Sequence, residues 1–217
     1  MVVIALTVPT QGTKGMTAIL VDRDTPGFSV GKVEDKMGLR AAAVSKLVLE
    51  DCRVPKTNRL GQEGDGFQIA MGGLDGGRIG IASQAVGVAQ GALEEAVHYA
   101  KEQVQFGKTI STNQGLQWYI ADMATRVEAA RLLTLQAASK RQNGASVSKY
   151  AFMAKYYAAE AASYVCDLSL QIHGGYGYMK DYPIEHMYRD ARIIRVYEGT
   201  SEVQKIVIAK EVIKEIP

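Results

Sequence analysis

The stretch Gly61-Gln62-Glu63-Gly64-Asp65-Gly66 decides how this sequence of 217 residues is divided. Before it, short runs rich in β-branched residues alternate with turn residues, and after it the pattern is helical to the end of the chain. Glycine clusters of this kind are typical of connectors between elements. We therefore expect a domain boundary here, with a small β-domain over residues 1–60 and a helical domain over residues 61–217.

The first part predicts strands. The clearest runs are Val2–Val8, Met16–Val21 and Leu47–Val54, and Phe28–Val33 is a weaker candidate. Turn residues at Pro9-Thr10-Gln11-Gly12 and at Asp24-Thr25-Pro26-Gly27 separate these runs.

The second part predicts four long helices, over about 67–104, 113–142, 147–172 and 201–215. Apolar residues recur at helical spacing in the last three of them; they are Leu116, Ile120, Met123, Val127, Ala130, Leu133, Phe152, Tyr156, Val165, Leu168, Val203, Ile206, Val207 and Ile213. Long amphipathic helices with short links predict an antiparallel bundle. The fold class is therefore mainly α, with a helical bundle preceded by a partial β-domain. The mostly apolar third helix suggests that the bundle packs against another bundle in an oligomer.

The first predicted helix is unusually rich in glycine, which lowers helix stability. We expect close approach of a neighbouring backbone or a ligand along it, at Gly72, Gly73, Gly76, Gly77, Gly80, Gly87 and Gly91.

Composition excludes several classes of partner. The net charge of +2 is too small to indicate a nucleic-acid or membrane partner, and no apolar run reaches the roughly 18 residues of a membrane helix. Met1–Pro9 lacks the basic segment of a signal peptide. Cys52 and Cys166 stand far apart without other ligands at metal-binding spacing, so we expect two reduced thiols, a reducing compartment and no metal.

The stretch Tyr197-Glu198-Gly199-Thr200 places a carboxylate between an aromatic residue and a glycine, ahead of a Thr/Ser helix cap. With five further blocks in the same order, the chain resembles the acyl-CoA dehydrogenases over essentially its whole length, and the short-chain (butyryl-CoA) members most closely. Those blocks are Lys36-Met37-Gly38-Leu39-Arg40, Glu50-Asp51-Cys52-Arg53-Val54-Pro55, Gln105-Phe106-Gly107-Lys108, Gln171-Ile172-His173-Gly174-Gly175-Tyr176-Gly177-Tyr178 and Tyr188-Arg189-Asp190-Ala191.

The resemblance implies an FAD enzyme that oxidises a short-chain acyl-CoA to the trans-2-enoyl-CoA. In that family the glutamate matching Glu198 removes the α-proton while the β-hydrogen leaves as hydride to flavin N5. The thioester oxygen is hydrogen-bonded by a flavin ribityl hydroxyl and by the backbone N–H of the same glutamate. In isovaleryl-type and some long-chain relatives the base stands instead at the position of Gly77, which disfavours those subclasses here.

The same resemblance assigns further site residues. Asp75, Arg78 and Gly199 match positions that contact the substrate. The cofactor positions are Gln103, Gln114, Gln171, Ile172, His173, Gly174, Gly175, Thr200, Ser201 and Glu202, and Gln114 with Gln171–Gly175 reaches the FAD of a neighbouring subunit. We prefer a packed residue to a catalyst for His173. Gly174, Gly175 and Gly177 close a helix rather than open one, so they are no Rossmann fingerprint.

Two departures from the family pattern bear on function. Gln103 replaces an arginine that faces the FAD pyrophosphate, which removes a charge-assisted contact of typically about 1.5–3 kcal/mol. Nothing in the sequence matches the family's N-terminal helical domain or the first half of its β-domain, so we expect residues 1–60 to be the second half of that domain.

Three functions therefore compete: an acyl-CoA dehydrogenase portion, a non-catalytic oligomerisation module, and an enoyl-CoA reductase running the reverse reaction. The family precedent implies a homotetramer, or a homodimer, that passes electrons to an electron-transfer flavoprotein. It also implies a bacterial cytoplasmic or a mitochondrial matrix location. For Arg189, Arg192 and Arg195, which recur every three residues, we prefer a solvated or salt-bridged helix face to a partner patch.

Overall fold

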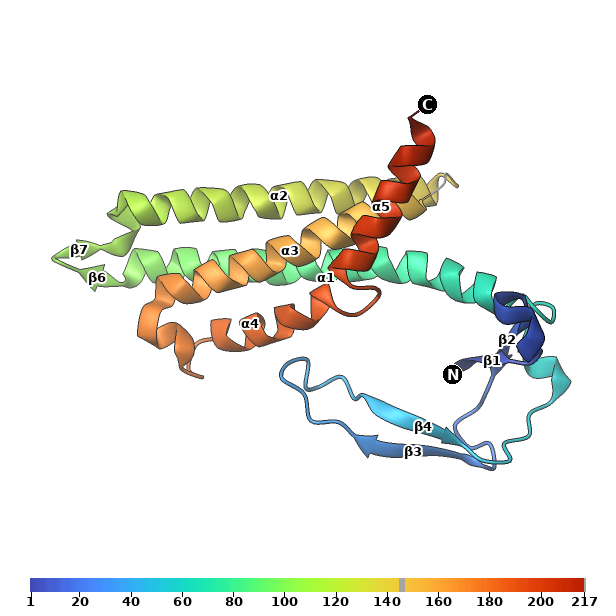
Figure 1. Cartoon of the computed structure of the whole chain (residues 1–217). Helices are drawn as coiled ribbons and strands as arrows, with labels where there is room; N and C mark the ends of the chain where they lie inside the picture. The colour runs from blue at the N-terminus through green and yellow to red at the C-terminus, as the bar shows by residue number, and fades with distance from the viewer. Residues whose placement is uncertain (145–146, 217) are drawn as a thin grey trace. The chain divides into compact units, whose positions relative to one another are not determined.

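The computed structural model describes residues 1–144 and 147–216, which form two compact units. The first unit holds residues 1–36 and 40–74, and the second holds residues 37–39 and 75 onward. Helix α1 (Gly66–Glu102) begins in the first unit and continues through the second (Figure 1).

The first unit contains two small antiparallel sheets. One has the order β1-β2-β5, from Val2–Leu6, Met16–Leu20 and Arg59–Leu60, with Val2 opposite Leu20 and Leu6 opposite Met16. The other pairs β3 (Phe28–Val33) with β4 (Ser45–Leu49). Short 3₁₀ helices cover Pro9–Gly15 and Lys56–Asn58. The four predicted strands exist, but β4 ends at Leu49 rather than Val54, because Asp51 has a φ of 49° that no strand accommodates. Strand β5 was not predicted.

The second unit is a bundle built from α1, α2 (Gln114–Gln142), α3 (Ser148–His173), α4 (Ile184–Arg192) and α5 (Ser201–Glu215). All four predicted helices are confirmed to within two residues at each end. Gly174, at φ 58°, ends α3 as expected. The sequence did not predict α4, nor the hairpin of β6 (Val104–Gln105) and β7 (Lys108–Thr109) between α1 and α2. Further 3₁₀ turns lie at Ile110–Thr112, Gly174–Tyr178 and Ile193–Arg195.

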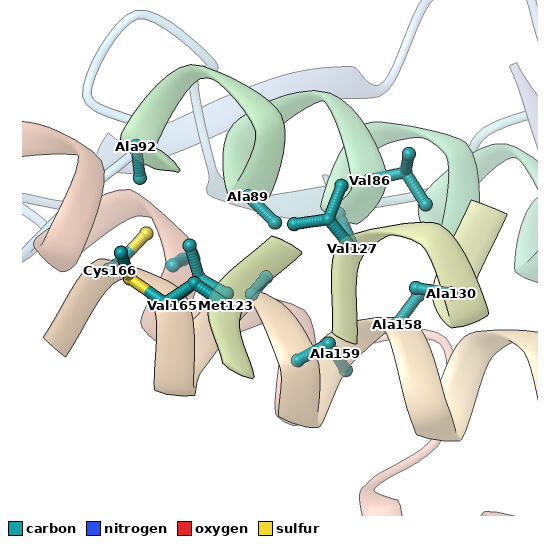
Figure 2. Packing of buried hydrophobic residues seen from close by; sticks show 14 of the residues in the cluster. Val86, Ala89, Ala92, Met123, Val127, Ala130, Ala158, Ala159, Val165 and Cys166 are labelled. Atoms are coloured by element: carbon teal, nitrogen blue, oxygen red, sulfur yellow. The ribbon is translucent and has the colours of Figure 1, made fainter. Parts of the chain in front are cut away.

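The bundle core is packed mainly with small side chains from three helices. Figure 2 shows Ala89 of α1, Val127 of α2 and Ala159 of α3 pointing into the same interior. Small residues at helix contacts allow the axes to approach closely. The Ser169 hydroxyl adds a buried link between α3 and α1, since it donates to the Ala92 carbonyl at 2.7 Å.

The burial of α3 has its explanation within the chain, since α2, α4 and α5 all pack against it. Its apolar character is thus no sign of an oligomer, and the predicted oligomer rests on the family resemblance alone. The stripe expected on α2 is confirmed, with Met123, Val127 and Ala130 buried. The expectation that the apolar stripe of α5 faces the core is wrong. Val203, Ile206 and Ile213 are exposed, whereas Ser201 and Gln204 are buried.

Among the described residues, two of the α1 glycines from Gly72 to Gly91 lie where a side chain would come too close to a neighbour, and a Cβ atom at Gly91 would make an ordinary contact with Met187 at 3.5 Å. A Cβ atom at Gly76 would lie 2.0 Å from Nη1 of Arg141, and one at Gly77 would lie 2.9 Å from Oε2 of Glu198. A Cβ atom at Gly72, Gly73, Gly80 or Gly87 would meet no atom within 4 Å in the described residues, so no neighbouring segment of this chain approaches them closely, and the expected approach of a ligand stays a prediction there.

The arginine series and the cysteines agree with their sequence interpretation. Arg189 donates to both carboxylate oxygens of Glu185 at 2.9 Å, and Arg195 donates to Glu160 at 2.9 Å, which makes a salt-bridged face. Both cysteines are free thiols, and burial raises the pKa of Cys166 to about 12. Among residues 1–144 and 147–216, no helix is long and apolar enough to cross a bilayer.

Candidate active site

Glu198 lies in the loop before α5, in a backbone conformation that is rare for its residue type. Its φ is 55°, and the next residue, Gly199, has a φ of 92°. Such left-handed conformations cost a non-glycine residue about 1–2 kcal/mol and need support from the surroundings. The carboxylate oxygen Oε2 is buried and has no hydrogen-bond partner in the described residues.

The carboxylate stands directly against α1 at Gly77. A Cβ atom added there would lie 2.9 Å from Oε2 and 3.1 Å from Cδ of Glu198. Gly77 therefore leaves the volume that the carboxylate occupies. The two positions that the sequence compared as alternative sites of the base are neighbours in space.

Two side chains hold the backbone of this loop. The Lys155 ammonium, from α3, donates to the Gly199 carbonyl at 2.6 Å, and the Gln204 amide donates to the carbonyls of Glu198 and Gly199 at 3.0 Å each. Lys155 and Gln204 are both fully buried. Burial lowers the pKa of Lys155 to about 8, and the charge of Glu198 is the largest influence opposing that shift. Neither residue was predicted to belong to the site. Lys155 lies on the alanine-rich buried face of α3, between Ala151 and Ala158.

Arg78 lies one residue beyond Gly77 and is 7% exposed, so it is no surface cation. Its Nη1 pairs with Asp75 at 2.6 Å, and its guanidinium lies 4.1 Å from the ring centre of Phe152. The second oxygen of Asp75 accepts a hydrogen bond from the Ser148 hydroxyl at 2.7 Å. Two of the three predicted substrate residues, Asp75 and Arg78, therefore form one ion pair close to Gly77.

The residues after Glu198 form the first turn of α5. Thr200 is the N-cap, and its hydroxyl oxygen accepts from the Val203 N–H at 3.4 Å. The Ser201 hydroxyl is buried and donates to Glu160 at 2.6 Å. Hydrogen bonds from its own backbone N–H and from Thr200 lower the pKa of Glu202. Before the loop, the Tyr197 hydroxyl donates to Gln84 of α1 at 2.6 Å.

Of the other predicted cofactor residues, Gln171–Gly175 lie at the C-terminal end of α3, far from Glu198. Gln103 and His173 border one cavity of about 180 Å³, which Tyr99, Tyr182 and Glu102 also line. The His173 ring stacks on Tyr99 with centroids 4.3 Å apart, and its Nδ1 lies 2.7 Å from the Ser169 carbonyl oxygen. Its buried Nε2 has no partner in the described part of the chain. His173 is thus the packed residue that the sequence indicated, with one free polar atom.

The remaining members of that set differ in exposure. Gln114 begins α2 and is exposed, as are Gln171, Gly174 and Gly175, whereas the Ile172 side chain belongs to the core. Eighteen residues of α3 separate Lys155 from His173, which is about 27 Å at 1.5 Å per residue. The structure thus brings Asp75, Arg78, Gly199 and the Thr200–Glu202 turn together around Glu198, and keeps the Gln103 and His173 group apart from them.

The site is therefore a buried carboxylate against a helix glycine in a helical bundle. The profile of the acyl-CoA dehydrogenase C-terminal domain matches residues 64–213, and the chain belongs to the acyl-CoA dehydrogenase family. One of its relatives is more than half identical to this chain in sequence. Acryloyl-CoA reductase (NADH) of Anaerotignum propionicum is 56% identical over 99% of this chain and 54% of its own length.

Two further relatives show the same partial match. The caffeyl-CoA reductase-Etf complex subunit CarC of Acetobacterium woodii is 52% identical over 98% of this chain and 56% of its own. The structure of butyryl-CoA dehydrogenase from Megasphaera elsdenii is 46% identical with a TM-score of 0.96, over 98% of this chain and 55% of its own. The chain therefore spans about half the length of these relatives.

Proposed function

We propose that this chain supplies the catalytic base of a flavin-dependent acyl-CoA dehydrogenase, which oxidises a short-chain acyl-CoA to the trans-2-enoyl-CoA. One observation carries the proposal: the buried, unpartnered Oε2 of Glu198, aimed at a helix glycine. A carboxylate without a hydrogen-bond donor keeps its lone pairs available for a substrate C–H. Gly77 leaves the space that this carboxylate occupies beside α1.

The neighbouring groups support the same chemistry. An α-C–H is a very weak acid, so the charge that develops on the thioester oxygen needs hydrogen-bond donors. None of the hydrogen bonds within the described residues uses the backbone N–H of Glu198, which leaves it as one such donor. The Asp75–Arg78 pair beside the base would position the acyl-CoA.

FAD is the proposed cofactor, and when bound it would accept the β-hydrogen as hydride. The residues present fit such a group, because the buried Nε2 of His173 lacks a protein partner and borders the cavity beside Gln103. The N-terminal turn of α5 would offer the backbone N–H groups of Thr200 and Ser201 to a second part of the cofactor, since the N–H of Glu202 already binds its own carboxylate. Because Ser201 already donates its hydroxyl to Glu160, its contribution would come from the backbone.

The names of the relatives favour one further candidate. Acryloyl-CoA reductase uses the same family scaffold, so the chain would serve equally in an enoyl-CoA reductase, in which the Glu198 carboxyl returns a proton to the α-carbon. The non-catalytic oligomerisation module stays a third possibility. Its support is the exposed apolar face of α5 at Val203, Ile206 and Ile213.

An electron-transfer flavoprotein is the proposed redox partner, supported by the name of the Acetobacterium relative. A homotetramer, or a homodimer, follows from the family precedent. A bacterial cytoplasmic location, or a mitochondrial matrix one, is part of the same proposal and is supported by two free thiols.

The first test uses the purified chain with added FAD, alone and mixed with the N-terminal half of the Megasphaera butyryl-CoA dehydrogenase. A yellow complex whose flavin absorbance bleaches on adding butyryl-CoA supports the dehydrogenase. Bleaching that occurs only with a reductant, and is reversed by crotonyl-CoA, supports the reductase instead. A colourless oligomer that stays inert with the added half supports the module.

The Glu198→Gln variant tests the assigned base. We expect it to bind butyryl-CoA with unchanged affinity and to lose bleaching by at least a thousandfold in rate, because a neutral amide cannot accept the α-proton. Glu211→Gln is the matched control, since Glu211 is a half-buried glutamate on α5 whose ion pair among the described residues is with Lys214. Full bleaching in the Glu198 variant rules out this glutamate as the base.

A further inference from the structure

Lys155 lies near the candidate base, and the proposed function does not use its charge. It lies in the N-terminal third of α3 with none of its surface exposed, on the same helix as the buried residues Phe152, Ala158 and Ala159. Burying an ammonium group is costly unless strong hydrogen bonds or an opposite charge compensate. Within the described residues no carboxylate lies within ion-pairing distance of it, so its charge is balanced only at longer range.

The charged groups that influence Lys155 come from four parts of the chain. Glu198 in the loop, Glu160 on α3 and Glu202 on α5 favour its charged form, whereas Arg78 on α1 opposes it. Glu198 has the largest effect of the three carboxylates. The ammonium therefore lies in the field of the candidate base without touching its carboxylate.

The direct contact of Lys155 is to the backbone of the loop. Its Nζ donates to the Gly199 carbonyl at 2.6 Å, a distance typical of a charge-assisted bond. Gln204 binds the same carbonyl, but it lies only five residues further along the chain and is neutral. Lys155 is thus the group that attaches the Glu198–Gly199 turn to a different helix.

We propose that Lys155 is a positioning residue, whose ammonium holds the left-handed turn at Glu198 and Gly199 so that the carboxylate stays against Gly77. The assignment of Glu198 as the base rests on the proposed function, whereas the hydrogen bond by which Lys155 holds the turn does not. A turn with φ values of 55° and 92° relaxes when its carbonyl loses a donor, and the carboxylate then leaves its buried place.

The test of the hold uses this chain alone, without cofactor. Amide hydrogen exchange is measured over residues 197–203 in the wild type and in Lys155→Met, which keeps an unbranched side chain without the charge. We expect exchange in this segment to accelerate at least tenfold, with exchange over residues 85–100 changed by less than twofold. Lys149→Met is the matched control, because Lys149 lies on the same helix and pairs with Glu215. Unchanged exchange in 197–203 overturns the proposal.

A second measurement avoids any folding defect of that variant. The pKa of Lys155 is followed by NMR of its side chain in the wild type and in Glu198→Gln. We expect a value near 8 in the wild type and a lower one in the variant, because the largest attractive charge is gone. An identical Lys155 pKa in both proteins means that the ammonium does not sense the base, and overturns the proposal.

The catalytic consequence is read in the flavin-loaded complex with the N-terminal half of the Megasphaera enzyme. We expect Lys155→Met to lower kcat at least tenfold while KM for butyryl-CoA changes less than threefold. Equal losses in both constants, or none, would overturn the positioning role. A wild-type complex without any turnover would instead refute the proposed function. The hydrogen-exchange and NMR results would still show whether Lys155 holds the turn.

Discussion

At the scale of single residues, the site depends on one glycine that has no side chain and one glutamate that fills the resulting space. A Cβ atom at Gly77 would meet only the mobile end of Glu198, at 2.9 Å from Oε2. Alanine there therefore moves the carboxylate and not the backbone. The helix itself gains, since alanine is about 1 kcal/mol better than glycine in a helix interior.

We accordingly expect Gly77→Ala to separate stability from activity. Its free energy of unfolding should stay within about 1 kcal/mol of the wild type, while bleaching by butyryl-CoA slows at least tenfold. Urea unfolding and stopped-flow absorbance measure the two quantities. Gly87→Ala is the control, because a Cβ atom there meets nothing within 4 Å. Normal bleaching in Gly77→Ala would mean that the carboxylate works from another place.

At the scale of elements, the Asp75–Arg78 pair links α1 to the start of α3 through Ser148. Removing the acid leaves a guanidinium that is 7% exposed without its partner. Breaking one side of a buried pair typically costs about 3 kcal/mol or more. We expect Asp75→Asn to lower the free energy of unfolding by about that amount in urea titrations. Glu211→Gln in the more exposed α5 pair should change it by less than about 1 kcal/mol; equal effects would contradict the buried role.

The elements also show how far the sequence could be interpreted. Periodic apolar residues such as Met123 and Val127 predicted the long helices closely, because burial there follows the helical repeat. Helix α4 was missed because its residues, from Glu185 to Arg192, are mostly charged or polar and its contacts come from elsewhere in the chain. The β6–β7 hairpin depends on Phe106 at φ 53° and Gly107 at φ 80°, a local conformation that propensity alone does not give.

The site was predictable where a motif carried it and not where packing did. Glu198 and Gly77 were found from the family pattern, but nothing local indicated that they touch. Lys155 looks like any helix lysine until its neighbours are known, although its place among alanines was a usable signal. The apolar face of α5 was misassigned because Gln204 turns inward to bind two backbone carbonyls, which forces Val203 outward.

At the scale of the whole molecule, Lys155 makes the free energy of unfolding depend on pH. Its pKa is lowered from 10.5 to about 8 in the folded chain. Between these two values the unfolded chain binds the proton and the folded chain does not, so this group makes stability rise with pH. Below pH 8 both states are charged, and the cost of burying the ammonium is fully present.

We therefore expect the free energy of unfolding of the wild type to increase relative to that of Lys155→Met as pH rises from 7 to 10. The gain should be at most about 3 kcal/mol. Cys166, whose pKa is raised to about 12, acts in the opposite direction above pH 9, but it is common to both proteins and cancels in the difference. Urea titrations at four pH values give the comparison, and parallel curves would contradict a buried, charged Lys155.

The contact between Gly77 and Glu198 also constrains how such a protein can evolve. One interior volume can receive a carboxylate from the helix or from the loop, but a side chain at both positions would collide. A lineage that transfers the base from one position to the other must pass through a sequence with two glutamates or with none. We expect a chain with a glutamate at both positions to crowd two carboxylates into this one volume, and a chain with neither to lack the proposed base.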